Sequence, residues 1–314
     1  MGLQSPTINN CTFTGNTAKD KGGAISNTGG GSPEITNCQF IKNVAAPADE
    51  ANDGAGGAIN NFGSAPTIVN CLFYGNQAGD DAEDFGGAIF NNNGSNASII
   101  NCTVIENSSY SGGGIYNDDN SDAIITNTII YGNIIEGGAG SQVRNWAGSD
   151  PTFTNCDIEG GWDGSGVENS SSTPVDGGGN INSDPEFTGT SLNPSHPFSL
   201  LGTSPCADAG DNIANSETYD LRGSGFERKL DKTDGSSGTI DIGAYEYKYG
   251  VDYTNDNIIF VDHDASGNDD GTTWANAYTS FQDALDAAVS GKQIWVAAGT
   301  YKPSSEVGGS GDKY

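Results

Sequence analysis

The chain of 314 residues is strongly acidic, with 12 lysines and arginines against 41 aspartates and glutamates and a formal net charge of −29. A field of this sign repels nucleic acid and anionic membrane surfaces, so neither is an expected partner. The chain has no run of about 18 apolar residues, which excludes a membrane-spanning helix, and its first residues lack the basic and apolar regions of a signal peptide.

The composition also predicts the class of secondary structure. Only 34% of the residues are hydrophobic and 47 are glycine, yet the apolar residues gather in short β-rich runs such as 66–69 and 123–126. Disordered chains avoid such runs. Short apolar runs separated by Gly, Asn and Asp clusters predict an all-β fold with many turns.

A two-part repeat fills the first half of the chain. Its first part is an Asn-Cys pair followed by an apolar residue and a second Asn, with copies at 10–16, 37–43, 70–76, 101–107, a Thr-containing copy at 127–133 and a degenerate copy at 155–158. Its second part is Gly-Gly-Ala-Ile or Gly-Gly-Gly-Ile, starting at residues 22, 56, 86 and 112. Successive cysteine positions lie 27, 33, 31, 26 and 28 residues apart, counting Thr128, a period that suits one coil of a solenoid.

Within each copy the apolar residues alternate, which indicates strands with one face turned inward. Coils stacked at the strand spacing of about 4.8 Å place identical residues in ladders. Inward Cys and Phe or Ile then form the core, the recurring Asn bonds to the Asn above and below, and Gly-Gly provides the corner. We therefore predict an all-β, right-handed parallel β-helix, with a short capping helix in the C-terminal segment.

Four cysteines share one repeat position: Cys11, Cys38, Cys71 and Cys102. We expect one inward column of free thiols that act as small hydrophobic side chains, extended by Thr128. A disulfide between adjacent coils is an alternative, because stacked Cα atoms fall within the range that a disulfide allows. Metal binding is a further alternative, although the chain has no CxxC motif and no Cys/His cluster.

The repeated Phe-x-x-Asn and Gly-Gly-Ala-Ile elements, over roughly residues 5–145, resemble the polymorphic outer-membrane protein repeat of bacterial surface adhesins and autotransporter passengers. A second block, at 182–187, 200–210 and 241–247, resembles the C-terminal module of bacterial extracellular β-helix proteins of the choice-of-anchor type, with Cys206 where that family usually has Ala. These resemblances imply secretion, surface display and a β-helix without catalytic residues.

The last segment resembles the beginning of such a β-helix. A strand at 258–262 and the Gly-Thr-Thr-Trp stretch at 271–274 lead into an amphipathic helix at 280–289, with Phe281, Leu285 and Val289 on one face. Gly291 ends the helix, and a first coil strand follows at 293–301. The expected organisation is therefore β-helix repeats at 1–160, terminal coils and a C-terminal cap at 161–250, and an N-terminal-cap-like segment at 256–314.

Catalytic and metal sites find little support in the pattern of charged residues. A polysaccharide lyase needs a basic residue near its substrate, and residues 5–160 hold only four cations, Lys19, Lys21, Lys42 and Arg144. The irregular acidic stretches between Ala45 and Ala55 and between Gln77 and Phe85 are interpreted as solvated loops, with a hydrolytic carboxylate pair as the weaker alternative. Calcium is a further alternative, and its candidate ligands are Asp80, Asp81, Glu83, Asp84, Asp262, Asp264, Asp269 and Asp270.

We therefore expect no enzyme and no cofactor other than calcium, and an extracellular structural protein of a bacterial surface, matrix or filament. An adhesin or carbohydrate-binding module is the alternative, for which Tyr74, Tyr110, Tyr116 and Tyr131 would line one face; a polysaccharide lyase or hydrolase comes third. The expected partner is a second copy: residues 256–314 would dock on the first coil of the next molecule through the strand Gln293–Thr300, which builds a head-to-tail filament. The same contact within a longer tandem array is the competing interpretation.

Overall fold

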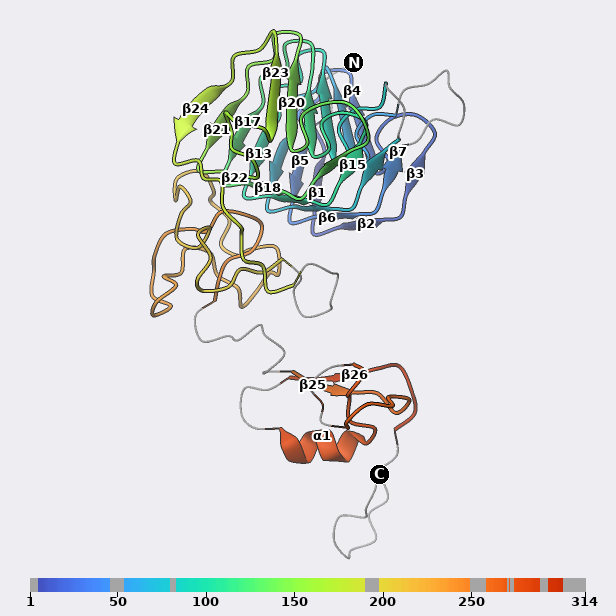
Figure 1. Cartoon of the computed structure of the whole chain (residues 1–314). Helices are drawn as coiled ribbons and strands as arrows, with labels where there is room; N and C mark the ends of the chain where they lie inside the picture. The colour runs from blue at the N-terminus through green and yellow to red at the C-terminus, as the bar shows by residue number, and fades with distance from the viewer. Residues whose placement is uncertain are drawn as a thin grey trace, which may run out of the picture. The chain divides into compact units, whose positions relative to one another are not determined.

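A computed structural model describes residues 5–45, 54–79, 83–189, 198–248, 258–269, 271, 274–288 and 293–301. The chain divides into two compact units, one comprising Met1–Thr190 with Phe198–Tyr249, the other Ser191–Pro197 with Gly250–Tyr314. The first unit is a parallel β-solenoid of about six coils followed by a loop-rich module, here called the lateral module (residues 181–248) (Figure 1). The predicted fold is confirmed.

Each coil contributes one short strand to each of several parallel sheets, and the sheets run along the solenoid. The strands of the first two sheets are paired in register from coil to coil. Sheet 1 contains β1 (Thr7–Asn9), β5 (Glu34–Thr36), β9 (Thr67–Val69), β13 (Ser98–Ile100), β17 (Ile124–Thr126), β21 (Thr152–Thr154) and β24 (Val175–Gly178). Sheet 2 contains β2 (Thr12–Thr14), β6 (Gln39–Ile41), β10 (Leu72–Tyr74), β14 (Thr103–Ile105), β18 (Ile129–Tyr131) and β22 (Asp157–Ile158).

The remaining two sheets complete the wall of the solenoid. Sheet 3 contains β3 (Thr17–Ala18), β7 (Val44–Ala45), β11 (Gln77–Ala78), β15 (Ser108–Ser109) and β19 (Ile134–Ile135). Sheet 4 contains β4 (Ile25–Thr28), β8 (Ile59–Phe62), β12 (Ile89–Asn92), β16 (Ile115–Asn117), β20 (Val143–Trp146) and β23 (Val167–Ser170).

Identical side chains stack inside the solenoid as the repeat predicts. The rings of Phe13, Phe40 and Phe73 lie parallel, with centroids 5.0 and 4.8 Å apart. Cys38, Cys71, Cys102 and Cys156 are fully buried in the same core, and all six cysteines are free thiols. Cys11, expected to be buried, is exposed, because no strand of the described residues lies on the outer side of β1 and β2.

Asparagines that are buried except at the ends of each row form two continuous amide ladders. In the first ladder, each Nδ2 group donates to the Oδ1 atom of the next coil at 2.8–2.9 Å, along Asn16, Asn43, Asn76, Asn107 and Asn133. The second ladder has the same direction and similar distances, along Asn27, Asn61, Asn91, Asn117, Asn145 and Asn169. Because buried amides without partners are costly, the ladders fix the register of each coil on the next.

The Gly-Gly corners need glycine for two reasons. The first glycine has a positive φ, for example +67° at Gly56 and +67° at Gly86, a conformation that most side chains resist. The second glycine has no space: a Cβ on Gly57 would lie 2.1 Å from the carbonyl oxygen of Gly87 in the next coil. Any larger residue at the second position would therefore separate the coils.

The lateral module packs along the side of the solenoid, whereas the sequence suggested that residues 161–250 form terminal coils and a C-terminal cap. Leu72 and Ile105, on the outer face of sheet 2, share a cluster with Phe198, Leu221 and Tyr245. Ile129, farther along the same face, packs with Leu200, Cys206 and Ile242. The module therefore spans several coils, and the solenoid strands themselves continue to Gly178.

The second unit contains β25 (Ile258–Val261), α1 (Phe281–Ala287) and β26 (Gln293–Val296), and its two strands pair in parallel. Ser280 caps α1 by accepting a hydrogen bond from the Asp283 N–H group. The buried residue of α1 is Ala284, whereas Phe281 and Leu285 are 37% and 45% exposed. The apolar face predicted for this helix is therefore not the face that packs on the strands, and Val289 lies outside the described residues.

Thiol reactivity tests the cysteine column. We expect one thiol, that of Cys11, to react rapidly in the native monomer and all six to react after denaturation, because the other five are fully buried. The variant Cys11→Ser should then show no rapid labelling. Rapid reaction of a second thiol in the native protein would contradict the inward column.

The phenylalanine stack makes a prediction on stability. Phe73→Ala should lower the free energy of unfolding by about 3–5 kcal/mol, because it removes a fully buried ring from the core. Phe62→Ala is the matched control, since Phe62 is 47% exposed on β8, and should cost less than about 1 kcal/mol. Urea unfolding of both variants measures the difference, and equal losses would contradict the assignment of Phe73 to the core.

Candidate binding groove

Two rows of side chains point outward from sheet 2. The first row includes Leu72, Thr103, Ile129 and Asp157, all buried beneath the lateral module. The second row runs along Ile41, Tyr74, Ile105 and Tyr131 in register, and its tyrosines are half-buried. The lateral module therefore covers the first row and also Ile105 of the second row, while Tyr74 and Tyr131 stay partly exposed.

The asparagines that precede the cysteines attach the lateral module to the solenoid. These residues adopt the left-handed conformation, with φ of +52° at Asn70 and +47° at Asn101, and stand at the corner between sheets 1 and 2. Asn70 accepts a hydrogen bond from Arg228 at 2.9 Å, and Asn101 donates to the carbonyl oxygen of Asp241 at 2.9 Å. Asn127 exchanges two hydrogen bonds with the backbone of Asp211.

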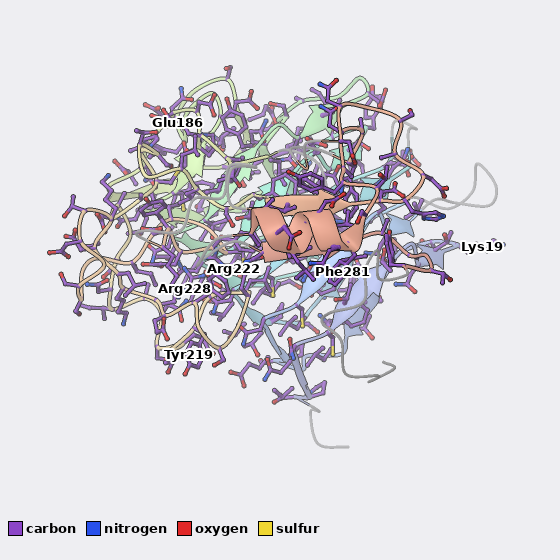
Figure 2. All side chains as sticks on the ribbon, turned by 90° about the horizontal axis from the view of Figure 1, so that it is seen from below. Lys19, Glu186, Tyr219, Arg222, Arg228 and Phe281 are labelled. Carbon is purple, nitrogen blue, oxygen red and sulfur yellow. The ribbon has the colours of Figure 1, made fainter. Side chains whose placement is uncertain are left out.

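A buried ionic network holds the lateral module itself together. Arg228 pairs with Glu246 at 3.4 Å, and both side chains are only 1% exposed. Arg222 pairs with Asp220, which also accepts a hydrogen bond from the Glu246 N–H group. Figure 2 shows both arginines within the module, with Tyr219 at its edge and Glu186 on the opposite side of it. The motifs around residues 220–222 and 241–247 are therefore structural.

The candidate site is a groove between sheet 2 and the first residues of the lateral module. It has a volume of about 340 Å³. Ile105 on β14, which is 3% exposed, and Tyr131 on β18 line it from sheet 2, and Phe187 lines it from the lateral module. Three carboxylates and one glycine complete the lining: Glu106, Asp184, Glu186 and Gly132.

The local backbone conformation explains why the lining residues lie at the groove. Glu106 and Gly132 occupy equivalent left-handed corner positions of successive coils, with φ of +53° and +63°. The lining from the lateral module is shaped by a turn in which the Asp184 carboxylate accepts a hydrogen bond from the Glu186 N–H group at 2.9 Å. Glu186 in turn accepts a hydrogen bond from the Thr203 hydroxyl.

The electrostatic field of the groove is negative. Burial raises the pKa of Tyr131, and the negative charges of Asp184, Glu159 and Asp157 raise it further. Burial and the neighbouring Glu106 carboxylate similarly raise the pKa of Tyr74 in the same row. The arrangement therefore favours cations over anions and places two aromatic rings beside the carboxylates.

Glu159 also terminates the first amide ladder. Asn133 donates to Gln142 at 2.7 Å, and Gln142 donates to the Glu159 carboxylate at 2.7 Å. Because every amide in the ladder points its N–H groups the same way, a carboxylate at the donor end is electrostatically favourable. The Gly132 N–H group also donates to Glu159, at 2.9 Å, so the ladder ends beside the groove.

Asp157 is a buried carboxyl group between the solenoid and the lateral module. The Cys206 thiol donates to it at 3.0 Å, and the Ser183 N–H group donates to it at 3.0 Å. Burial raises the pKa of Asp157 to about 6, although these two hydrogen bonds partly oppose the shift. Burial similarly raises the pKa of Glu246 to about 7.

The calcium candidates are scattered. Asp80, Asp81 and Asp270 lie outside the described residues. Asp84 is 1% exposed and accepts a hydrogen bond from the Gly54 N–H group at 2.6 Å, while Glu83 is exposed. The acidic stretches 45–55 and 77–85 each end at a residue of a regular coil, because Ala55 and Phe85 form a parallel β-bridge between neighbouring coils.

In the second unit, ligand atoms of Asp262, His263 and Asp264 lie within 4.8 Å of one another. His263 also contacts Asp264 at 3.1 Å. Asp269 faces other partners, because its carboxylate accepts hydrogen bonds from the backbone and hydroxyl groups of Thr279. The predicted group of four aspartates therefore does not form one cluster among the described residues.

The four tyrosines proposed as one binding face do not share a face. Tyr74 and Tyr131 belong to the outward row of sheet 2, with Ile105 between them. Tyr116 is 3% exposed and packs with Phe85 and Phe90 on sheet 4, and Tyr110 follows sheet 3. Sequence reasoning missed the groove itself. Its signals were Glu106, where the first, third and fifth repeat copies have Gly15, Gly75 and Gly132, and the acidic Asp184–Phe187 segment.

The fold and its outward faces define a parallel β-solenoid with a laterally attached module. A family model described as "Right handed beta helix region" matches residues 2–178, more than half of the chain, and the protein belongs to this family. No curated protein and no solved structure matches the chain. Among the described residues, no helix is both long and apolar enough to cross a membrane.

The buried carboxyl groups make the stability of the first unit depend on pH. The folded pKa of Asp157, about 6, exceeds its ordinary value of 3.8, so its stabilising contribution is complete below pH 3.8 and is lost as pH rises through 6. The free energy of unfolding should therefore fall between pH 5 and pH 8, and Asp157→Asn should reduce this fall by about 1 kcal/mol.

Urea unfolding at both pH values measures the effect. Asp122→Asn, at an exposed position on the solenoid, is the charge-matched control and should leave the fall unchanged. If the pH dependence of Asp157→Asn equals that of the parent protein, Asp157 does not hold a proton in the folded state.

Proposed function

We propose that this protein is a non-enzymatic, extracellular structural protein of a bacterial surface, matrix or filament. The observation that carries the proposal is the continuity of its scaffold. Hydrophobic columns and two amide ladders run from coil to coil, and the lateral module is anchored on three successive coils through Asn70, Asn101 and Asn127. Such a scaffold is suited to holding a fixed shape outside a cell.

The distribution of raised pKa values supports a non-enzymatic role. A catalytic acid with a raised pKa must reach its substrate. Asp157, Asp241 and Glu246 have raised pKa values because they are buried, and each is at most 1% exposed. Asp118, whose pKa is also raised mainly by burial, directly follows β16 of sheet 4 and is not part of the groove lining. A screen on acidic polysaccharides should detect no turnover, and reproducible cleavage or elimination would overturn this part of the proposal.

We further propose that copies associate head to tail. Among the described residues, β26 pairs only with β25, which leaves one edge of β26 without a strand. The edges of β1 to β4 on the first described coil are likewise unpaired. Unpaired parallel edges favour strand addition, so residues 256–314 of one copy would extend the first coil of another.

Comparison of residues 1–255 with the full chain of 314 residues tests this assembly. The full chain should sediment as large species and form filaments in electron micrographs, and the truncated chain should remain monomeric, because it lacks β25 and β26. If the full chain stays monomeric at high concentration, or if the truncated chain polymerises equally, association through this segment is wrong.

An adhesin is the second candidate function, and the groove on sheet 2 is the observation that favours it. Two aromatic rings and three carboxylates surround a cavity of about 340 Å³ on the surface of a rigid scaffold. Binding sites on rigid elements retain their geometry without a cost in ordering. A filament subunit can carry such a site, so the two candidates are compatible.

A further inference from the structure

The groove combines an apolar floor with aromatic walls. Its floor is Ile105, which is 3% exposed, and the rings of Tyr131 and Phe187 line it as well. Phe187 is held by an edge-on contact with Phe198, with ring centroids 5.5 Å apart. Apolar and aromatic walls of this kind suit an organic ligand with a hydrocarbon portion.

The rim of the same groove is uniformly acidic. Glu106, Asp184 and Glu186 line it, and among the described residues no ion pair joins any of these three to a lysine or arginine. Lys42 has the same left-handed repeat position as Glu106, but in a coil two coils away. Its Nζ atom lies 6.0 Å from the centre of the Tyr74 ring. Lys19 lies far from Glu186, on the other side of the first unit (Figure 2).

These two features together select one class of ligand. A primary ammonium group can contact carboxylates and the faces of aromatic rings at once. Its alkyl chain can lie on Ile105, as lysine stems commonly lie on apolar surface. A divalent metal would gain nothing from the apolar floor and the rings, and a hydroxyl-rich sugar would lose hydrogen bonds with water over Ile105.

We propose that the groove binds a lysine side chain presented by a partner polypeptide. The alkyl stem lies on Ile105, the ammonium group lies between Tyr131 and Phe187, and Glu106, Asp184 and Glu186 neutralise its charge. Gly132 matters because its lack of a side chain keeps the groove open next to Glu106. This inference goes beyond the structural role and specifies the ligand of the adhesin alternative.

Blocked amino acids are the probes, with the chain of 314 residues as the receptor. N-acetyl-lysine methylamide should bind saturably, with a dissociation constant in the millimolar range that weakens at least threefold between 20 and 200 mM salt, because salt screens the attraction between an ammonium group and the carboxylates of the rim. N-acetyl-norleucine methylamide has the same alkyl chain without the charge and should bind at least tenfold more weakly. Chemical-shift changes or calorimetry report both affinities.

Two variants test the assigned residues. The double variant Glu106→Gln, Asp184→Asn should weaken lysine binding at least tenfold and reduce its salt dependence, with Glu186 as the remaining carboxylate. The double variant Glu34→Gln, Asp122→Asn changes the net charge equally at exposed positions on sheet 1 and near it, and should bind like the parent protein. Tyr131→Leu keeps an apolar wall but removes the ring, and should weaken binding at least threefold.

The outcomes separate the alternatives. Lysine binding that depends on Glu106, Asp184 and Tyr131 supports the proposal. Equal binding of norleucine shows a merely apolar groove and overturns it, as does equal loss in the charge-matched control. Saturable calcium binding that displaces the lysine probe shows a metal site, and tighter binding of glucosamine shows a sugar site; either overturns it. No binding of lysine also overturns it, and leaves the assembly test of the structural role unaffected.

Discussion

The structure depends on one constraint, the exact superposition of each coil on the next. Parallel pairing places Phe13, Phe40 and Phe73 in one stack, and the ring separation of about 5 Å is the spacing of paired strands. The same superposition brings each ladder asparagine within 2.8–2.9 Å of its neighbour. A coil shifted by one residue would reverse every side chain and leave the ladder amides buried without partners, so packing and hydrogen bonding select the same register.

The outside of the solenoid uses the same repeat for a different purpose. The Asn of each Asn-Cys pair takes a left-handed corner conformation, which turns its amide away from the solenoid core once in every coil. The lateral module binds these amides on successive coils. Arg228 donates a hydrogen bond to Asn70, and Asn101 donates one to the carbonyl oxygen of Asp241. The module buries the first row of sheet 2 and Ile105 of the second row, and the groove lies where Ile105 and Tyr131 meet the first residues of the module.

The repeat explains why the fold was predictable and the site was not. The spacing of the cysteines and the Gly-Gly pairs is local in the sequence, and stacking converts it directly into columns and corners. The groove joins Glu106 and Tyr131 to Glu186 across the boundary between the solenoid and the lateral module. From the sequence we expected that module at the end of the solenoid. The residues of the module carry no pattern that indicates which face of the solenoid they cover. For the same reason, the tyrosines of sheets 2 and 4 could not be assigned to different faces.

Native-state hydrogen exchange of Asn107→Leu tests the central claim, that the coils are held in register by shared ladders. Leucine removes the acceptor for the Asn76 side chain and backbone and the donor to Asn133 at nearly constant volume. The account predicts loss of protection for backbone N–H groups in the coils on both sides, including Asn76 and residues near Asn133. Loss of protection confined to residue 107 and its immediate neighbours in the chain would contradict it.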